Sequence, residues 1–182
     1  HAISNMAYVS NPEVLARNQS SYQEPHSKKG LYLDGDMLVD AMILGVDNTS
    51  VSMTFDQLIG QGIDYTYNGK VYHFNKEMVE FYDRRIGIFS GKDISVTAII
   101  LNGWNDSVPQ LMPPGIQRVG SANYYMFNAS TKEGAETIEA LASFLAERYS
   151  GQEGSKGKVS NWIIGNEINN QVWNYAGPKE VE

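Results

Sequence analysis

The strongest chemical signal in this sequence is an Asn-Glu pair that directly follows a short apolar segment. Residues 159–165 (VSNWIIG) predict a β-strand, and Asn166 and Glu167 stand at its carboxyl end. In parallel α/β folds, the loops that leave this end of the strands form the pocket. A carboxyl group placed there can donate or accept a proton, so Glu167 is the candidate catalytic residue.

Glycoside hydrolysis is the reaction that suits a carboxyl group in this position. It needs one carboxylic acid to protonate the leaving oxygen and a second carboxylate to attack or to activate water. A partly desolvated glutamic acid stays protonated near neutral pH, as the first role requires. Asn166 could then hydrogen-bond a sugar hydroxyl near the reacting carbon. The alternative is a structural role, in which Glu167 is buried and paired with an arginine.

Other polar and aromatic residues follow the predicted strands at the same end. The candidates for substrate binding are Asn102, Trp104 and Asn105 after the third strand, Asn169 and Trp173 after Glu167, and Asp34 after the first strand. A tryptophan ring can stack on a sugar, but Trp104 as an anchor of its loop is an equal alternative. For Asp34, a turn or the cap of the next helix is the favoured role.

Several classes of function are excluded by what the sequence lacks. His26 and His73 lack metal-ligand spacing and the chain has no cysteine, so no metal site is expected. No phosphate-binding or dinucleotide-binding motif is present, and no cofactor is predicted. The net charge of −7 and the short basic runs argue against nucleic-acid binding. No apolar run reaches the roughly 18 residues of a membrane span.

The elements that must position Glu167 alternate between strands and helices. Strands are predicted at residues 29–33, 49–55, 94–101 and 159–165, and helices at 36–44, 76–89 and 130–149, with the start of another near 177. Asn68-Gly69 between two aromatic arms predicts a β-hairpin at residues 64–74 that decorates a loop. The alternation is typical of an α/β fold with a parallel sheet and right-handed crossovers.

Two regions are expected along the chain. Residues 1–28 are rich in Asn, Ser, Gln and Pro and predict an extended arm, and residues 29–182 predict one α/β domain. Four strands could form an open sheet. A closed (β/α)8 barrel needs eight strands and roughly 250 residues, so the chain would then be about half of one and incomplete at its C-terminus.

The segment WIIGNEIN at residues 162–169 resembles the motif that ends the fourth strand of the clan-A (β/α)8-barrel glycoside hydrolases. More narrowly, SKKGL at residues 27–31, FLAERYSG at 144–151 and the LGV junction at 44–46 resemble a family of uncharacterised bacterial glycosidase-like domains. This resemblance spans about residues 11–178. It implies the N-terminal half of a TIM barrel, about four βα units, with Glu167 as the acid/base of a retaining enzyme.

The resemblance also implies what the chain would need from elsewhere. The nucleophile would be a second Glu at the end of a seventh strand, so this chain alone would be inactive. The expected partners are an oligo- or polysaccharide, and either the remaining half of the barrel or another copy of the chain. An extracellular or cell-surface location in a bacterium is expected. The alternative is a non-catalytic carbohydrate-binding or scaffold protein with a degenerate barrel.

Overall fold

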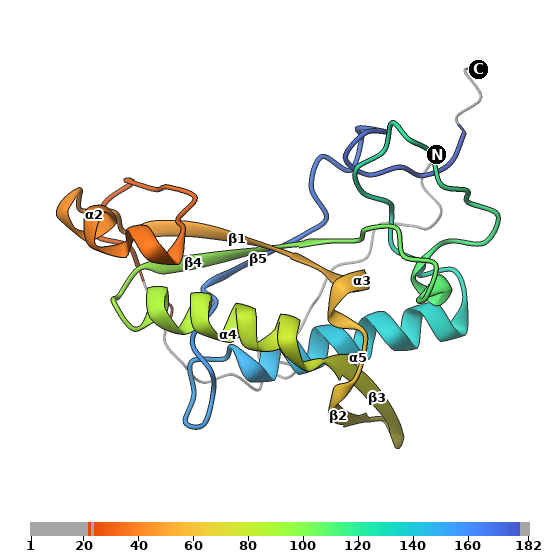
Figure 1. The fold of residues 1–182 in the computed structure, drawn as a ribbon, viewed down its shortest axis with the longest axis horizontal. Helices are drawn as coiled ribbons and strands as arrows, with labels where there is room; N and C mark the ends of the chain where they lie inside the picture. The colour runs from red at the N-terminus through yellow and green to blue at the C-terminus, as the bar shows by residue number, and fades with distance from the viewer. Residues whose placement is uncertain (1–21, 23, 179–182) are drawn as a thin grey trace, which may run out of the picture.

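The computed structural model describes residue 22 and residues 24–178 of the chain. Its elements, in chain order, are η1 (Gly35–Met37), α2 (Leu38–Ile43), β1 (Asn48–Thr54), α3 (Phe55–Leu58), β2 (Gly62–Tyr67), β3 (Lys70–Asn75), α4 (Lys76–Ser90), β4 (Ser95–Leu101), η2 (Pro109–Leu111), α5 (Lys132–Arg148) and β5 (Asn161–Ile164). They form a three-stranded parallel sheet, an antiparallel hairpin and covering helices (Figure 1). The predicted α/β class with a parallel sheet is confirmed, and the described residues form no closed barrel.

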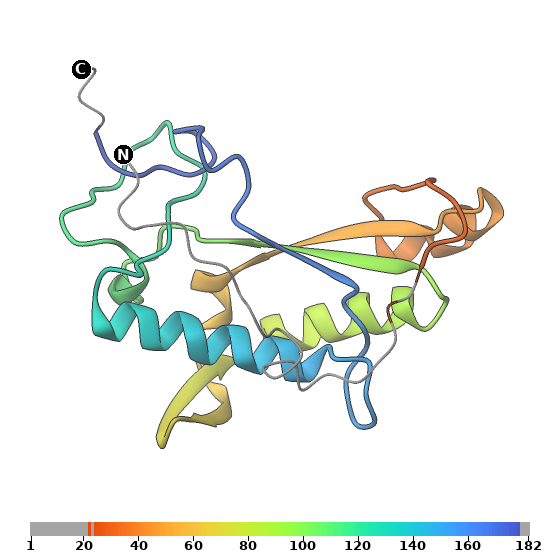
Figure 2. The same ribbon diagram turned by 180° about the vertical axis from the view of Figure 1, so that it is seen from behind.

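The parallel sheet has the order β1-β4-β5, so strands that follow one another in the chain are neighbours in space. The register joins Asn48 to Ser95 and Thr97 to Asn161. The crossover from β1 to β4 contains α4, and the crossover from β4 to β5 contains α5. Both helices lie on the same side of the sheet in the two opposite views (Figures 1 and 2). The carboxyl ends of all three strands therefore meet at one edge of the molecule.

The core lies between the sheet and these two helices. On β1 the buried residues alternate with half-buried ones, and Val51 and Met53 are buried, as the sequence predicted. Val96, Ala98 and Ile100 of β4 are also fully buried. The predicted strand at residues 49–55 ends one residue early, because Phe55 begins α3. Its ring stays in the core, since it is buried against Phe127 at a centroid distance of 5.4 Å.

The predicted strand at residues 29–33 is reduced to one parallel bridge between Gly30 and Asn48. Leu31 N donates to Asn48 O at 3.1 Å, and this pairing ends there. Leu33 N donates instead to the side-chain Oγ1 of Thr49, at 3.3 Å. The strand prediction was therefore wrong for most of this segment, because the backbone donor of Leu33 is satisfied by a side chain.

The β2–β3 hairpin turns at Asn68 and Gly69, which both have positive φ, of 48° and 77°. This is the geometry that the Asn-Gly pair predicted. The hairpin does more than decorate a loop, because Phe74 is buried and its ring lies 4.5 Å from that of Phe144 on α5. Tyr65 Oη also donates to Ser143 Oγ of α5, at 3.0 Å. The hairpin is thus part of the packed body.

Some predictions fall where the structure gives no description. Of the predicted arm at residues 1–28, only residue 22 and residues 24–28 are described, and the helix predicted to start near 177 lies almost wholly outside the described residues. Within the described part of the chain, none of the helices combines the length and apolarity needed to cross a membrane.

Candidate functional site

Glu167 lies just beyond the carboxyl end of β5, with its side chain exposed. The chain bends there through Gly165 at φ 75° and Glu167 itself at φ 46°. A non-glycine residue with positive φ is uncommon and costs of order 1 kcal/mol, and such positions cluster at functional sites. The local turn is closed by Asn170, whose N donates to Glu167 O at 2.7 Å and whose Nδ2 donates to Oε2 at 2.9 Å.

The alternative role for Glu167, a buried carboxylate paired with an arginine, does not fit its surroundings. Within the described ranges, no ion pair joins Glu167 to a lysine or arginine. The expected partial desolvation is also missing, because the side chain is exposed in this chain. The carboxyl group is therefore held by Asn170 and open to a ligand or to another part of a larger assembly.

Two loops meet beside Glu167. The β4 loop, residues 102–131, and the β5 loop, residues 165–178, run side by side in both views (Figures 1 and 2). Tyr125 and Tyr175 form a parallel bridge, and Tyr175 N donates to Tyr124 O at 2.9 Å. Asn123 N also donates to Val172 O, at 2.7 Å. These backbone bonds fix the two loops to each other although no regular strand is present in either.

Five aromatic rings join the same two loops. This aromatic wall consists of Trp104, Tyr124, Tyr125, Trp173 and Tyr175. Tyr125 is its centre: it is 2% exposed, and its ring lies 5.1 Å from that of Trp104 and 5.7 Å from that of Tyr175. Tyr124 stacks on Trp173 at 6.0 Å, and Trp173 is exposed. The Tyr124–Trp173 pair therefore brings the wall to the surface of the molecule.

Trp104 is held as an anchor of its loop. Its Nε1 donates to Oδ1 of Asp106 at 2.8 Å, and its ring packs half-buried against Tyr125. Of the two roles that the sequence left open, these contacts favour the loop anchor. Trp173, by contrast, is placed where the sequence predicted a substrate contact.

Asn102 and Asn105 lie at the predicted end of the sheet, but their side chains serve the protein itself. Asn102 is 1% exposed, and its Nδ2 donates to the carbonyl oxygens of Leu111 at 3.0 Å and Met126 at 3.2 Å. Asn105 Nδ2 donates to Asp56 O at 3.2 Å. Both side chains are thus engaged by backbone groups, of the β4 loop for Asn102 and of α3 for Asn105, and their contact with substrate stays a prediction.

Of the remaining predicted residues, one has a structural role and two stay candidates for substrate contact. Asp34 is exposed and caps η1 by accepting a hydrogen bond from Asp36 N at 3.4 Å, which is the capping role that the sequence favoured. Asn166 is half-buried and Asn169 is exposed, and both flank Glu167 in the β5 loop. These two remain candidates for substrate contact.

Comparison with known families adds one finding. A model of a family of unknown function, DUF5722, matches residues 21–182. The chain belongs to the DUF5722 family. The comparisons with curated proteins and with solved structures each gave no match. The matched region includes Glu167 and the whole aromatic wall.

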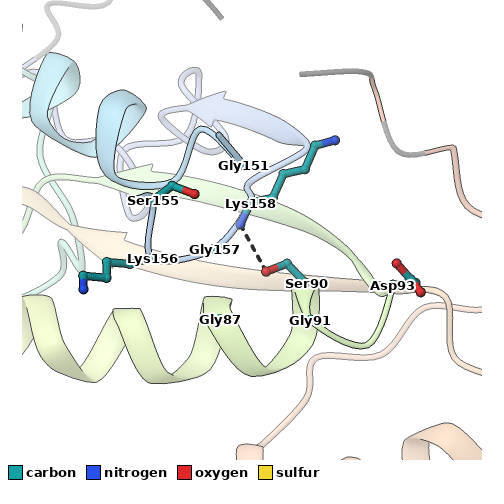
Figure 3. Close-up of a pocket in the computed structure, with 9 residues that line it drawn as sticks. All are labelled: Gly87, Ser90, Gly91, Asp93, Gly151, Ser155, Lys156, Gly157 and Lys158. Atoms are coloured by element: carbon teal, nitrogen blue, oxygen red, sulfur yellow. Dashed lines mark hydrogen bonds between the residues drawn. The ribbon is translucent and has the colours of Figure 1, made fainter. Parts of the chain in front are cut away.

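A separate hollow of about 680 Å³ lies at the opposite end of the DUF5722 sheet, where β4 and β5 begin (Figure 3). It is bounded by the end of α4 and the loop before β5, whose backbones approach closely at Gly87 and Gly157. Lys156 and Lys158 point away from each other in this view, and Lys158 N donates to Ser90 Oγ at 3.1 Å. The hollow results from a helix–loop crossing and has no convergent set of functional groups.

Two features of the DUF5722 site were missed from the sequence. The tyrosines of the aromatic wall come from two distant loops, and only the abundance of aromatic residues in the β4 loop hinted at them. Asp56, directly after β1, is 6% exposed and accepts a hydrogen bond from Gly103 N at 2.8 Å. Burial raises the pKa of this carboxyl group above its ordinary value. Among the described residues, no group of His, Asp and Glu side chains is arranged to hold a metal ion.

Proposed function

We propose that this chain is the N-terminal half of a (β/α)8-barrel glycoside hydrolase in which Glu167 is the general acid/base. The observation that carries the proposal is the exposed carboxyl group of Glu167 at the carboxyl end of a parallel strand, beside the aromatic wall. A carboxylic acid and a stacking surface are the two things that a glycosidase needs on one side of its cleft.

The arrangement of the sheet supports a barrel over a doubly wound fold. The strands follow chain order, and both crossover helices lie on one face. In a (β/α)8 barrel the helices form such an outer ring, whereas a doubly wound sheet carries helices on both faces. If the segment that bridges to β1 at Gly30 is counted as the first strand position, β1, β4 and β5 would take the second to fourth positions of the proposed barrel.

Among the described residues, no strand pairs with the outer edge of β5, and this supports a continuation of the sheet. Its residues Trp162, Ile163 and Ile164 are 37%, 42% and 66% exposed, on both faces of the strand. A parallel strand that is apolar on both faces is normally buried on both faces, by helices and by neighbouring strands. An open apolar edge of this kind pairs readily with another strand. The remaining half of the barrel would supply that strand, and a second copy of the chain is the alternative.

In the complete enzyme, Glu167 would protonate the glycosidic oxygen and then deprotonate the incoming water. The nucleophile would be a second carboxylate from the remaining half, with about 5–5.5 Å between the two carboxyl groups of a retaining enzyme. The same half would shield Glu167 from water, which a general acid needs near neutral pH. Asn166 and Asn169 would contact the sugar, and Tyr124 with Trp173 would stack on it.

The test replaces Glu167 with Gln in the full-length protein and measures hydrolysis of a panel of oligosaccharides. Glu139→Gln on the exposed face of α5 is the matched control. We expect Glu167→Gln to lose at least about 100-fold in kcat while sugar binding persists, and the control to keep full activity. Unchanged hydrolysis by Glu167→Gln would remove Glu167 from the chemistry.

A second candidate is a non-catalytic carbohydrate-binding protein. The stacked Tyr124–Trp173 pair favours it, because stacking needs neither a nucleophile nor an acid. Sugar binding by the full-length protein without any turnover would select this function. In either case the ligand would be a saccharide, and an extracellular or cell-surface location is part of the proposal.

A further inference from the structure

Asp56 has a position that the proposed chemistry does not use. It follows β1 directly, in the short helix α3, at the same edge of the sheet as Glu167. Among the described residues it is the one Asp, Glu, Lys or Arg in the buried class. Burying a carboxyl group costs free energy unless hydrogen bonds compensate for the lost water. The burial of the Asp56 carboxyl group therefore depends on the hydrogen bonds that it accepts.

These partners belong to the start of the β4 loop. Gly103 N donates to Asp56 Oδ1 at 2.8 Å, and Asn105 Nδ2 donates to Asp56 O at 3.2 Å. The two bonds reach the residues immediately before and after Trp104. The Asp56 carboxylate thus holds the backbone before that tryptophan, its carbonyl oxygen holds the side chain after it, and together they tie the end of β1 to the segment that leaves β4.

Gly103 is the residue type that permits this contact. A Cβ atom at position 103 would lie 2.6 Å from Asp56 Oδ1, and 3.0 Å from both Cγ and Oδ2. Those distances are closer than side-chain atoms tolerate, so the carboxylate occupies the space that any other residue at 103 would need. Asp56 and Gly103 therefore form a matched pair.

The contact is transmitted to the sugar-facing part of the site through packed rings. Trp104 packs against Tyr125 at 5.1 Å, and Tyr125 packs against Tyr175 of the β5 loop at 5.7 Å. Tyr125 N also donates to Asn102 O at 2.8 Å, one residue before Gly103. The backbone around Trp104 thus sets where Tyr125 lies, and Tyr124 follows as its chain neighbour.

We propose that Asp56 is a positioning residue that fixes the β4 loop and thereby the Tyr124–Trp173 face for saccharide binding. This inference rests on the proposed function for its ligand, but the loop geometry can be measured without one. Asp56 makes no contact with substrate in this account. Its carboxylate acts as a hydrogen-bond acceptor, and Gly103 N is the donor that it takes from the β4 loop.

The test compares Asp56→Asn with Asp56→Ala in the full-length protein, with Asp40→Asn on exposed α2 as the control. Asn keeps an acceptor oxygen for Gly103 N, and Ala removes it. In a background in which Trp162, Trp173 and every tryptophan outside this sequence are replaced by Phe, Trp104 alone remains. Acrylamide quenching of its fluorescence then reports the β4 loop directly.

We expect Asp56→Ala to increase quenching of Trp104, while Asp56→Asn and the control match the parent. With all tryptophans present, Asp56→Ala should raise KM or Kd for an oligosaccharide by roughly tenfold, with a smaller change in kcat, as for one lost hydrogen bond to a charged group. If Asp56→Ala does not fold, Gly103→Ala keeps the carboxyl group but displaces it, and should give the same pattern.

Three results would overturn the inference: quenching in Asp56→Ala equal to that of the control, equal damage by Asn and Ala, or a loss confined to kcat. If no saccharide binds to the parent protein, the proposed function fails. The quenching comparison still decides whether Asp56 positions the β4 loop.

Discussion

Asn170 donates a hydrogen bond from its Nδ2 to Oε2 of Glu167 across 2.9 Å, and its backbone N closes the same turn. The orientation of the carboxyl group therefore depends on a side chain three residues further along. Asn170→Ala should lower kcat/KM of the full-length enzyme by about tenfold, the scale of one hydrogen bond to a charged group. Glu139→Ala, on the exposed face of α5, separates this effect from loss of any polar side chain. Equal rates for Asn170→Ala and the parent would show that the bond does not orient Glu167.

The exposed ring of Trp173 should carry sugar affinity. Trp173→Ala removes the partner on which Tyr124 stacks, and the expected loss is about 1–1.5 kcal/mol, or roughly tenfold in Kd. Isothermal titration with oligosaccharides measures it. Tyr67→Ala, on the hairpin away from the wall, should leave Kd unchanged. Equal affinity for Trp173→Ala and the parent would place the sugar elsewhere.

Asp56 should make stability depend on pH. Burial raises its pKa above 3.8, with the backbone N–H of Gly103 acting in the opposite direction. An acid with a raised pKa in the folded state contributes stability that is complete below the unfolded pKa and is lost as pH rises through the folded pKa. Asp56→Asn cannot ionise, so its stability relative to the parent should increase as the pH rises above 3.8 into the range where folded Asp56 ionises.

Urea unfolding at several pH values measures this difference for Asp56. The titratable neighbour is Tyr82, whose pKa burial also raises above 10.0, well outside that pH range. A difference in the free energy of unfolding that stays constant with pH would mean that Asp56 is not desolvated.

Arg148 on α5 and Asp83 on α4 form the ion pair that joins the two helices. Arg148 Nε and Nη2 donate to the two carboxylate oxygens at 2.7 and 2.6 Å, and Tyr149 Oη donates to Oδ1 at 3.1 Å. Arg148→Ala leaves a mostly buried carboxylate without its cation and should cost about 3 kcal/mol of unfolding free energy. Lys76→Ala breaks the exposed pair with Glu80 and should cost under about 0.5 kcal/mol. Equal costs in denaturant unfolding would contradict this account.

Local signals in the sequence predicted much of the fold. The Asn68-Gly69 pair has the positive φ angles of its turn, and β4 begins within one residue of the predicted strand. The predicted order of elements gave a parallel sheet with neighbouring strands in chain order. These features depend on a few adjacent residues or on the regular spacing of apolar residues, so they can be predicted from the sequence. The strand predicted at residues 29–33 was wrong for most of its length, because Leu33 N bonds the side chain of Thr49 in place of a neighbouring strand.

The candidate site was only partly predictable. Glu167 and Trp173 lie where the motif indicated, at the carboxyl end of β5 and in the loop that follows. The Asn102 side chain bonds backbone carbonyls of the β4 loop, and the Asn105 side chain bonds the carbonyl of Asp56 in α3, because backbone groups removed from water need partners. Asp56 could not be identified, since an acid in the first turn of a helix is usually exposed. Its burial depends on Gly103, which is distant in sequence.

The most direct test of the central claim is how the loss in Glu167→Gln depends on the leaving group. A general acid matters when the departing oxygen is basic, and much less when it leaves as an acidic phenol. With the full-length protein, we expect kcat/KM of the variant to fall at least about 100-fold on an alkyl glycoside but to keep most of its value on a dinitrophenyl glycoside of the same sugar, because kcat/KM reports the first step and not the later attack of water. Equal losses on both substrates, or no loss on either, would contradict the assignment of Glu167 as the acid/base.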